Sequence, residues 1–305
     1  MLEYPKNLRE FDEMFATEDA CLIFLEAVRW SKGFSCQSCQ HIKFWQLGPG
    51  LRRCQSCRTK NYVRANSIFA SSRLSLKIWF HAIWWFTAQK TGVNALNFQK
   101  NIGLGSYRSA WLLLHKIRNA MVHADRSLLQ GEVEIDEAFI GGVRSGKRGR
   151  GAEGKELVII AAECSGAKRV GRARIQRISN ASAKSIESFI LANVAKGATV
   201  HTDGWPSYNG LEQLGYIHLP KVSTSVNPDE LLPRVNIVTS LLKRWLLGTL
   251  HGRLDPKHMD QYFEEFLFRF NRRTSKVRGL LFQRVLENSI RVKPAPYKKI
   301  ISRKP

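Results

Sequence analysis

The spacing of apolar residues along the chain changes near residue 131. Before this point, apolar side chains recur every three or four residues, as Leu113 and Ile117 do, which is the period of a helix. After it, residues 132–140 (EVEIDEAFI) alternate and residues 156–164 (ELVIIAAEC) form a nearly continuous apolar run, both of which are strand patterns. The chain therefore predicts a helical region followed by a region built on a sheet.

Two segments give the first strong helix patterns, residues 17–30 (TEDACLIFLEAVRW) and 74–89 (LSLKIWFHAIWWFTAQ). Thr17 is a good N-terminal cap, and the two acids that follow it favour the first turn of a helix. The second segment is apolar on nearly every side, which predicts a helix buried between its neighbours.

Residues 91–122 predict a helix, a glycine-bearing turn and a second helix. The second helix has an apolar face formed by Ala110, Leu113, Leu114, Ile117 and Met121. Its polar residues lie largely off that face, and they are Arg108, His115, Lys116, Arg118 and Asn119. A helix-turn-helix inserts such a helix into the major groove, so Arg108, Lys116 and Arg118 are candidate DNA contacts. A helical linker with a solvated face fits the spacing equally well.

The region after residue 131 continues with alternating element types. Residues 169–178 (RVGRARIQRI) are a strand pattern, residues 182–194 a helix, and residues 198–203 (ATVHTD) another strand. Longer helices follow at residues 229–249 and 258–273. Three strands, a helix, a strand and further helices predict an α/β domain with a mixed sheet.

The net charge narrows the class of partner. The 305 residues include 48 Lys and Arg against 25 Asp and Glu, a formal net charge of +23, and the hydrophobic fraction of 44% excludes a disordered chain. A basic excess of this size is typical of proteins that bind nucleic acid or, second, an anionic membrane surface. The apolar stretch at residues 78–88 is far shorter than the roughly 20 residues that span a bilayer. With no apolar signal segment near residue 1, we expect a soluble cytoplasmic protein that handles nucleic acid.

Four of the six cysteines form two pairs with the same spacing. Cys36 and Cys39 make one C-x-x-C knuckle, Cys54 and Cys57 make another, and residues 40–53 separate them. Two knuckles at this separation are typical of a zinc ribbon, in which four thiolates hold one structural Zn²⁺. Structural disulfides would be reduced in the cytosol, and a redox site would need one such motif rather than two.

Other residues near these knuckles have simpler interpretations. Cys21 and Cys164 lie in apolar runs and are interpreted as small buried side chains. His41 follows the first knuckle, but four thiolates already complete the site, so we place it on the surface. Basic residues crowd the second knuckle, which suits docking on a phosphate backbone, and a solvated face explains them as well.

A glycine-rich segment follows the first strand pattern. Residues 141–147 fit the letters G-x-x-x-x-G-K of a nucleotide-binding loop, but Arg148 stands where Ser or Thr should bind Mg²⁺. We therefore exclude an ATPase and interpret the segment as a basic loop over a DNA backbone, with Arg144, Lys147 and Arg148 as contacts.

Two aspartates stand out in a chain with few acids. Asp136 lies within residues 132–140, and Asp203 ends residues 198–203. Carboxylates on neighbouring strands can converge on Mg²⁺, and two such ions can clamp the attacking and leaving oxygens of phosphoryl transfer. Ordinary surface or turn aspartates also fit these positions, because TDGW is a good turn sequence.

Three blocks of the chain closely resemble the ISXO-like transposases of bacterial insertion sequences. They are VEIDEAFIGG, HTDGWPSYNGL and LLKRWLLGTLHGRLDPKHMDQYFEEFLFRFNRR, in matching order behind a zinc ribbon, and the resemblance runs from about residue 18 to residue 273. It implies an RNase H-like catalytic domain of the DDE superfamily. The implied substrate is the pair of terminal inverted repeats of the element.

The resemblance assigns the candidate catalytic residues. Asp136 and Asp203 match the first two catalytic acids, and the third position falls on Asn236, where the superfamily most often has Glu. Lys243 follows two helical turns later on the same face. We therefore expect Asp136, Asp203 and Asn236 to hold two Mg²⁺ ions, and Lys243 to contact the DNA.

Four further residues are weaker candidates for a catalytic role. Glu137 should point to the opposite side of its strand and be structural. His201 shares the face of Asp203 and either supports the acids or packs in the core. Glu264 and Glu265 are alternative third acids, although a helix-surface or packing role fits them better.

Spacing and resemblance together predict a transposase that cuts and joins DNA with Mg²⁺. We expect it to act on double-stranded DNA near the nucleoid as a dimer or larger assembly, with no membrane partner. The expected segments are a helix with the zinc ribbon, a helix-turn-helix-like part, the catalytic domain and a basic tail, disordered or in contact with DNA, at residues 1–67, 68–130, 131–290 and 291–305. Two alternatives stay open: an inactive, transposase-derived DNA-binding regulator, which the neutral Asn236 favours, and a nuclease that does not join DNA.

Overall fold

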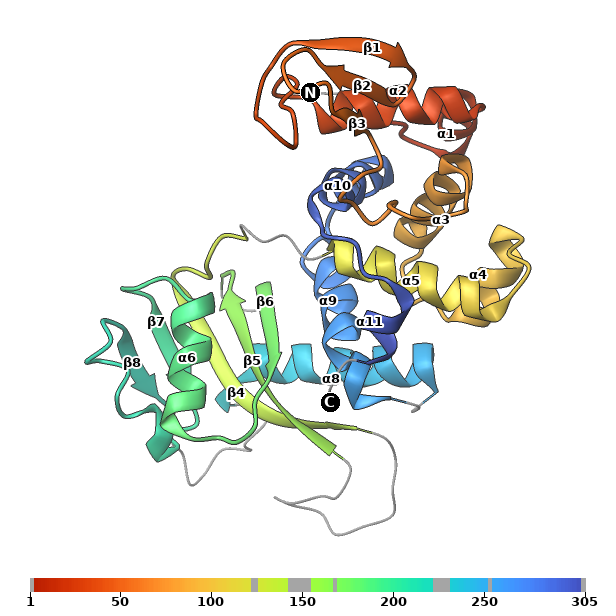
Figure 1. The fold of residues 1–305 in the computed structure, drawn as a ribbon. Helices are drawn as coiled ribbons and strands as arrows, with labels where there is room; N and C mark the ends of the chain where they lie inside the picture. Colours follow the sequence, from red (N-terminus) through yellow and green to blue (C-terminus); the bar gives the residue numbers. More distant parts are fainter. Residues whose placement is uncertain are drawn as a thin grey trace. The chain divides into compact units, whose positions relative to one another are not determined.

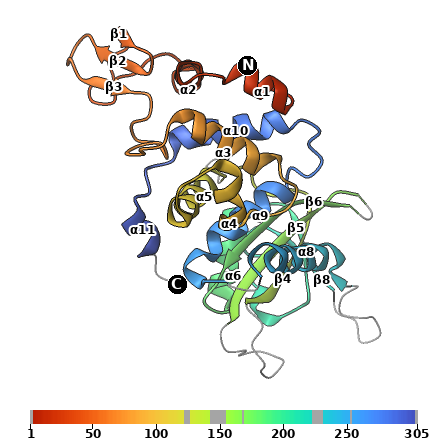
Figure 2. The same ribbon diagram turned by 90° about the vertical axis from the view of Figure 1, so that its right-hand side faces the viewer.

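The chain folds as two units, shown in Figures 1 and 2. The first combines residues 1–123 with residues 275–303, and the second consists mainly of residues 124–274. The structure is a computed structural model, and it describes residues 3–121, 126–141, 155–166, 169–221, 231–251 and 254–302.

The first unit begins with two short helices and a small sheet. Helices α1 (Leu8–Met14) and α2 (Glu18–Arg29) each start behind a side chain, Asn7 or Thr17, that accepts an amide hydrogen bond from the first turn. The sheet is antiparallel and consists of β1 (Phe44–Gly48), β2 (Leu51–Cys54) and β3 (Lys60–Tyr62), paired in that order. The Thr17 cap confirms the helix start expected from the sequence.

The rest of the first unit is helical, with α3 (Leu76–Ala88), α4 (Ala95–Ile102), α5 (Tyr107–Met121), α10 (Arg278–Arg291) and α11 (Tyr297–Ile301). Gly103 ends α4 in the left-handed conformation, with φ +71°, and thereby opens the turn to α5. The expected helix, glycine turn and helix are therefore present. All five apolar residues predicted for the inner face of α5 are buried.

Helix α10 corrects the segment boundaries expected from the sequence. It packs on α2, α3 and α5, and its fully buried Phe282 makes edge-on ring contacts with Phe11, Phe80 and Trp84 at centroid distances of 5.4 to 5.7 Å. The boundaries expected from the sequence put α10 in the catalytic segment and the residues after it in a basic tail. The tail instead forms α11 and buries Ile300.

The second unit is built on a five-stranded mixed sheet. Its strands are β4 (Glu132–Gly141), β5 (Lys155–Cys164), β6 (Val170–Arg177), β7 (Thr199–Thr202) and β8 (Ile217–Pro220). The order across the sheet is β6-β5-β4-β7-β8. β4, β5 and β6 pair antiparallel, whereas β7 and β8 run parallel to β4. β4 is therefore the central strand and pairs with neighbours of both kinds.

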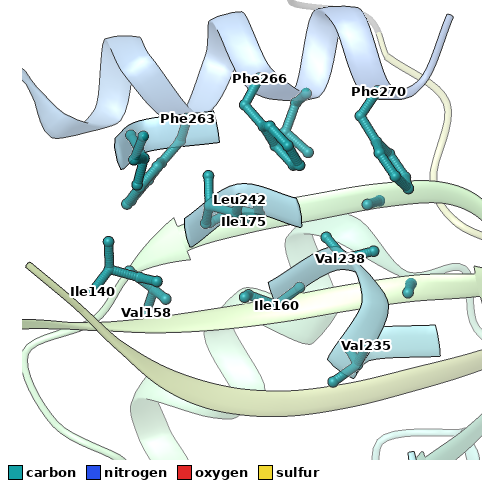
Figure 3. Packing of buried hydrophobic residues seen from close by; sticks show 14 of the residues in the cluster. Ile140, Val158, Ile160, Ile175, Val235, Val238, Leu242, Phe263, Phe266 and Phe270 are labelled. Carbon is teal, nitrogen blue, oxygen red and sulfur yellow. The ribbon is translucent and has the colours of Figure 1, made fainter. Parts of the chain in front are cut away.

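Helices cover both faces of this sheet. Helix α6 (Ala183–Asn193) packs on one face with the short helix η1 (Pro206–Tyr208). Helices α8 (Pro233–Leu250) and α9 (Met259–Phe270), joined through η2 (Pro256–His258), pack on the other. Figure 3 shows the second core, in which residues of the sheet meet Val235, Val238 and Leu242 of α8 and Phe263, Phe266 and Phe270 of α9.

The sequence alternation within β4 corresponds to these two cores. Val133 and Ile135 enter the core under α6, whereas Ala138 and Ile140 contact the core under α8 and α9. The N-terminal four-cysteine region and the C-terminal mixed sheet with helices are as predicted. Among the described residues, no helix is both long and apolar enough to cross a membrane.

Candidate functional site

The cysteines of the two knuckles meet at one point. The Sγ atoms of Cys36 and Cys57 are 3.5 Å apart, those of Cys39 and Cys54 are 3.6 Å apart, and all four lie within 4.8 Å of one another. Zinc–sulfur bonds of about 2.3 Å in a tetrahedron require sulfur–sulfur distances of about 3.8 Å. The cluster therefore has the size and the ligand set of a structural Zn²⁺ site.

Short-range backbone geometry forms this cluster. The residue after each knuckle, Gln40 or Arg58, has a left-handed φ of 60° or 59°, so the two knuckles turn in the same way. The buried side chain of Asn61 donates from Nδ2 towards Cys36 Sγ at 3.7 Å and accepts the amide of Gln37 at 2.9 Å. Such donors stabilise a thiolate. Cys21 is buried and Cys164 half-buried, both outside the cluster.

The two candidate acids lie at the same level of two adjacent strands. β4 and β7 pair in parallel, with Glu134 beside His201. Asp136 and Asp203 each follow two residues later, so the same register brings them side by side, with Asp203 immediately after the last residue of β7. Residues two apart on a strand share a face, so Asp136 shares the face of Glu134, on which α8 packs.

The environment of Asp136 disfavours its negative charge. Its pKa is raised to about 7, mainly by burial; the amide of Glu137, which donates to Oδ1 at 2.8 Å, opposes this shift, and the negative charges of Glu137 and Asp203 add to it. Asp203 is exposed, and its Oδ1 accepts the amide of Trp205 at 3.0 Å. Two carboxylates that repel each other form a site that a cation would stabilise.

Polar contacts on the opposite face of the sheet hold these strands in place. The hydroxyl of Tyr208, fully buried in the core under α6, donates to Glu137 Oε1. The hydroxyl of Thr202 and His218 Nε2 are 2.9 Å apart, which links the end of β7 to β8. Glu137 therefore points away from the face of Asp136, as its position in the strand suggested.

Helix α8 brings the third candidate to the same strand. Its first turn contacts Glu134 near the start of β4, and Lys243 lines a hollow of about 290 Å³ together with Gly141 at the end of β4. The helix therefore follows β4, and Asn236 lies at the end of α8 that begins beside Glu134. Asn236 is half-buried and Lys243 is exposed. Sequence reasoning did not select Glu134, because a lone Glu in an alternating strand gives no local signal.

The alternative acids are engaged elsewhere. Glu264 of α9 pairs with Arg126, and burial raises the pKa of Glu264. Glu265 is fully buried and pairs with Arg269 one turn later at 2.9 Å. His201 lies 3.5 Å from Glu132 through Nε2. Each of the two glutamates is therefore paired with an arginine of the same unit.

Comparisons with known proteins agree with this arrangement. Residues 128–271 match the family model of the ISXO2-like transposase domain, and residues 16–60 match that of the transposase zinc-ribbon domain. The chain carries an ISXO2-like transposase domain behind a transposase zinc ribbon. It is also 25% identical over 268 residues to a protein of Halobacterium salinarum described as "Uncharacterized protein in transposable element ISH50", across 79% of this chain and 88% of that protein. The resemblance drawn from the three sequence blocks is confirmed.

The matched ranges contain both candidate centres. The transposase domain includes Asp136, Asp203, Asn236 and Lys243, and the zinc-ribbon range includes all four clustered cysteines. The ribbon match and the four-thiolate cluster together support a structural Zn²⁺. The helices α3, α4 and α5 lie between the two matched ranges.

The candidate DNA contacts differ in exposure. Arg108 is exposed, with its guanidinium 3.9 Å from the ring centre of Tyr297. Lys116 is half-buried, and burial lowers its pKa. Arg118 is only 2% exposed and donates to the carbonyl of Val93 at 3.0 Å. Because α10 and α4 pack on α5, Arg118 is enclosed, which corrects its selection as a DNA contact. Arg144, Lys147 and Arg148 lie outside the described residues.

Proposed function

We propose that this chain is a DNA transposase that binds the terminal inverted repeats of its element and catalyses Mg²⁺-dependent strand cleavage and strand transfer. The family match supports a transposase in general terms. We further propose that its catalytic domain is RNase H-like, because a central strand with antiparallel neighbours on one side and parallel ones on the other carries the first acid, and helices cover both faces.

The observation that carries the proposal is the pairing of Asp136 and Asp203. Asp136 lies two residues beyond the Glu134–His201 pair on β4, and Asp203 lies two residues beyond it, directly after the end of the parallel strand β7. The raised pKa of Asp136, due mainly to burial and in smaller part to the charges of Glu137 and Asp203, supports a cation site here, because a cation would stabilise the ionised form. Carboxylate oxygens with room for water and substrate phosphates are the ligands that Mg²⁺ prefers.

Each residue then has a defined task. Asp136 would lose its proton and, with Asp203, supply two carboxylates, while the amide oxygen of Asn236 supplies a neutral third ligand. Bound Mg²⁺ would neutralise charge on the phosphate and lower the pKa of a water molecule. Lys243, farther along α8 at the end of β4, would hold the DNA backbone at a distance from the acids. The freed 3′ hydroxyl then attacks a target phosphodiester, which forms one phosphodiester bond while it breaks another.

DNA binding by the ribbon and the helices completes the proposal. The net charge of +23 favours a polyanionic partner, and the zinc ribbon belongs to a transposase family. Two transposon ends must be cut and joined together, so we propose that the protein acts as a dimer or larger assembly in the cytoplasm.

A strand-transfer assay on end-bearing oligonucleotides tests this function. Asp136→Asn and Asp203→Asn should each lower cleavage and joining by about 10³-fold or more, since the metal's charge stabilisation is worth several kcal/mol and 1.36 kcal/mol is tenfold in rate. Binding to the ends should remain. Asp260→Asn is the matched control, because Asp260 pairs with Arg177 on the same domain.

The outcomes separate the alternatives. Either aspartate variant joining ends at the wild-type rate would overturn the assignment of the acids. A wild-type protein that cuts but never joins would be a nuclease. A wild-type protein that binds ends tightly and stays inert at every Mg²⁺ concentration would be a regulator.

A further inference from the structure

A fully buried carboxylate lies next to the proposed catalytic acids. Glu134 is 0% exposed, two residues before Asp136 on β4, and neither the family match nor the proposed chemistry gives it a role. Burying a carboxylate is costly unless charged or dipolar partners compensate. Its partners therefore indicate its purpose.

The partners of Glu134 are the first amides of α8. Its Oε2 accepts the amides of Arg234 at 2.6 Å and Val235 at 3.1 Å, and its Oε1 accepts Nη1 of Arg234 at 2.7 Å. Lys221 Nζ lies 3.9 Å from the same Oε1. Both oxygens are thus directed at N–H donors, so Glu134 serves as an anchor for the helix and is not a metal ligand.

This anchor completes the N-terminus of α8. Leu232, which precedes the helix, makes no side-chain cap, and Pro233 in the first turn has no amide hydrogen. The amide of Asn236 bonds to the carbonyl of Leu232 at 3.1 Å, as in any helix. The amides of Arg234 and Val235 would otherwise lack acceptors, and Glu134 satisfies both from another element. Its charge also opposes the positive end of the helix dipole.

The geometry points to Glu134 as a positioning residue that fixes Asn236 relative to Asp136. This inference rests on the proposed function. Asn236 follows directly after the two amides that Glu134 holds, and Asp136 is its next neighbour on the same face of β4. One carboxylate therefore ties the strand of the first acid to the helix of the third ligand. Partners that orient ligands in this way typically contribute 10- to 100-fold in metal affinity or activity.

Glu134→Gln tests the anchor with little change in shape. Glutamine has one acceptor oxygen where glutamate has two, and its NH2 group only donates. It therefore cannot accept hydrogen bonds from both Arg234 Nη1 and the helix amides. Glu265→Gln is the matched control, because Glu265 is also fully buried and paired with an arginine, Arg269, in the same domain. A purely structural loss should be similar in both variants.

Hydrogen exchange and metal dependence, both measured on the full-length protein, decide the question. Hydrogen exchange should accelerate at the amides of Arg234 and Val235 in Glu134→Gln and stay at the wild-type rate there in Glu265→Gln. Mn²⁺ binding, measured by calorimetry, and the Mg²⁺ concentration for half-maximal cleavage should both shift by about 10- to 100-fold in Glu134→Gln alone. End binding should stay within about twofold of wild type.

The result also separates this inference from the proposed function. Unchanged exchange in α8 and unchanged Mn²⁺ affinity in Glu134→Gln would overturn the positioning role even if the wild-type protein is fully active. Equal losses of metal affinity in both variants would assign Glu134 a stability role only. An inert wild-type protein whose Mn²⁺ binding still depends on Glu134 would refute the proposed reaction and leave the positioning role standing.

Discussion

The two candidate metal centres are assembled in different ways. The cysteine cluster joins two knuckles whose outer members, Cys36 and Cys57, are 21 residues apart, and each knuckle turns through its own left-handed residue. The acids come from two parallel strands, and Asn236 comes from a helix that another residue of the first strand anchors. A centre made from local turns is visible in sequence spacing. A centre made from sheet register gives no such spacing signal, and here only the resemblance to a transposase family selected its residues before the topology was known.

The difference also concerns what each centre contributes. Four thiolates close a tetrahedral site and leave no position for substrate, so the ribbon's metal serves folding. The proposed ligands, two carboxylates and an amide, would leave a Mg²⁺ site open to water and phosphate, so this site could serve a reaction. Removing ligands should therefore unfold one region and silence the other without unfolding it.

The largest effect is expected at the ribbon. Cys36→Ser removes one of four zinc ligands, and structural Zn²⁺ in small zinc peptides contributes about 10–16 kcal/mol of apparent binding free energy. The ribbon should lose its zinc and its fold, and specific end binding should fall while charge-driven, non-specific binding persists. Zinc content and end affinity measure this. Cys164→Ser is the control, because Cys164 lies outside the cluster. Full end affinity in zinc-free protein would show that the ribbon is not needed for recognition.

The next effect is expected at Asn236. Asn236→Ala should lower strand transfer by about 10- to 100-fold, equivalent to roughly 1.4–2.7 kcal/mol of transition-state stabilisation. Asn236→Glu adds a negative charge, so it should keep partial activity and need less Mg²⁺. The measurement is strand transfer against Mg²⁺ concentration, with Asn180→Ala as control at the start of α6 on the other face of the sheet. A fully active Asn236→Ala would place the third ligand elsewhere.

Much of the fold could be predicted because local patterns determine it. The cap at Thr17, the alternation in β4 and the inner face of α5 all follow from residues close in sequence. The short strand β8 gave no signal, because its four residues IHLP are too few for a period. Helix α10 has an ordinary amphipathic pattern, which cannot tell which core the helix will join.

Charged residues were the least predictable. Arg118 and Glu134 look like surface residues in sequence, yet both are enclosed by elements distant in the chain. Each has a backbone partner, the carbonyl of Val93 for Arg118 and two amides at the start of α8 for Glu134. Backbone groups are the same in every residue, so no sequence motif reveals such partners.

A smaller effect is expected on the stability of the protein without Mg²⁺. The pKa of Asp136, about 7 in the folded chain, exceeds the ordinary value of 3.8, so the folded state favours the protonated form. Protonated Asp136 therefore contributes fully to the free energy of unfolding below about pH 4, and this contribution is lost as the pH rises through about 7. Asp136→Asn should therefore raise the free energy of unfolding at pH 8, without added Mg²⁺, by about 1–3 kcal/mol and change little at pH 4. Urea unfolding at both pH values checks this, and an equal effect at both would contradict it.

The smallest effect separates two arginines of one helix. Arg108→Gln removes an exposed cation, so if Arg108 contacts a phosphate, the slope of log affinity against log salt should fall by about 0.9. Arg118→Gln removes the buried donor to Val93 and should cost about 1–3 kcal/mol of stability with the salt slope unchanged. End binding at several salt concentrations, together with thermal unfolding, distinguishes the two. A reduced salt slope in Arg118→Gln, with unchanged stability, would mean that α5 opens on DNA and exposes a side chain enclosed in the free protein.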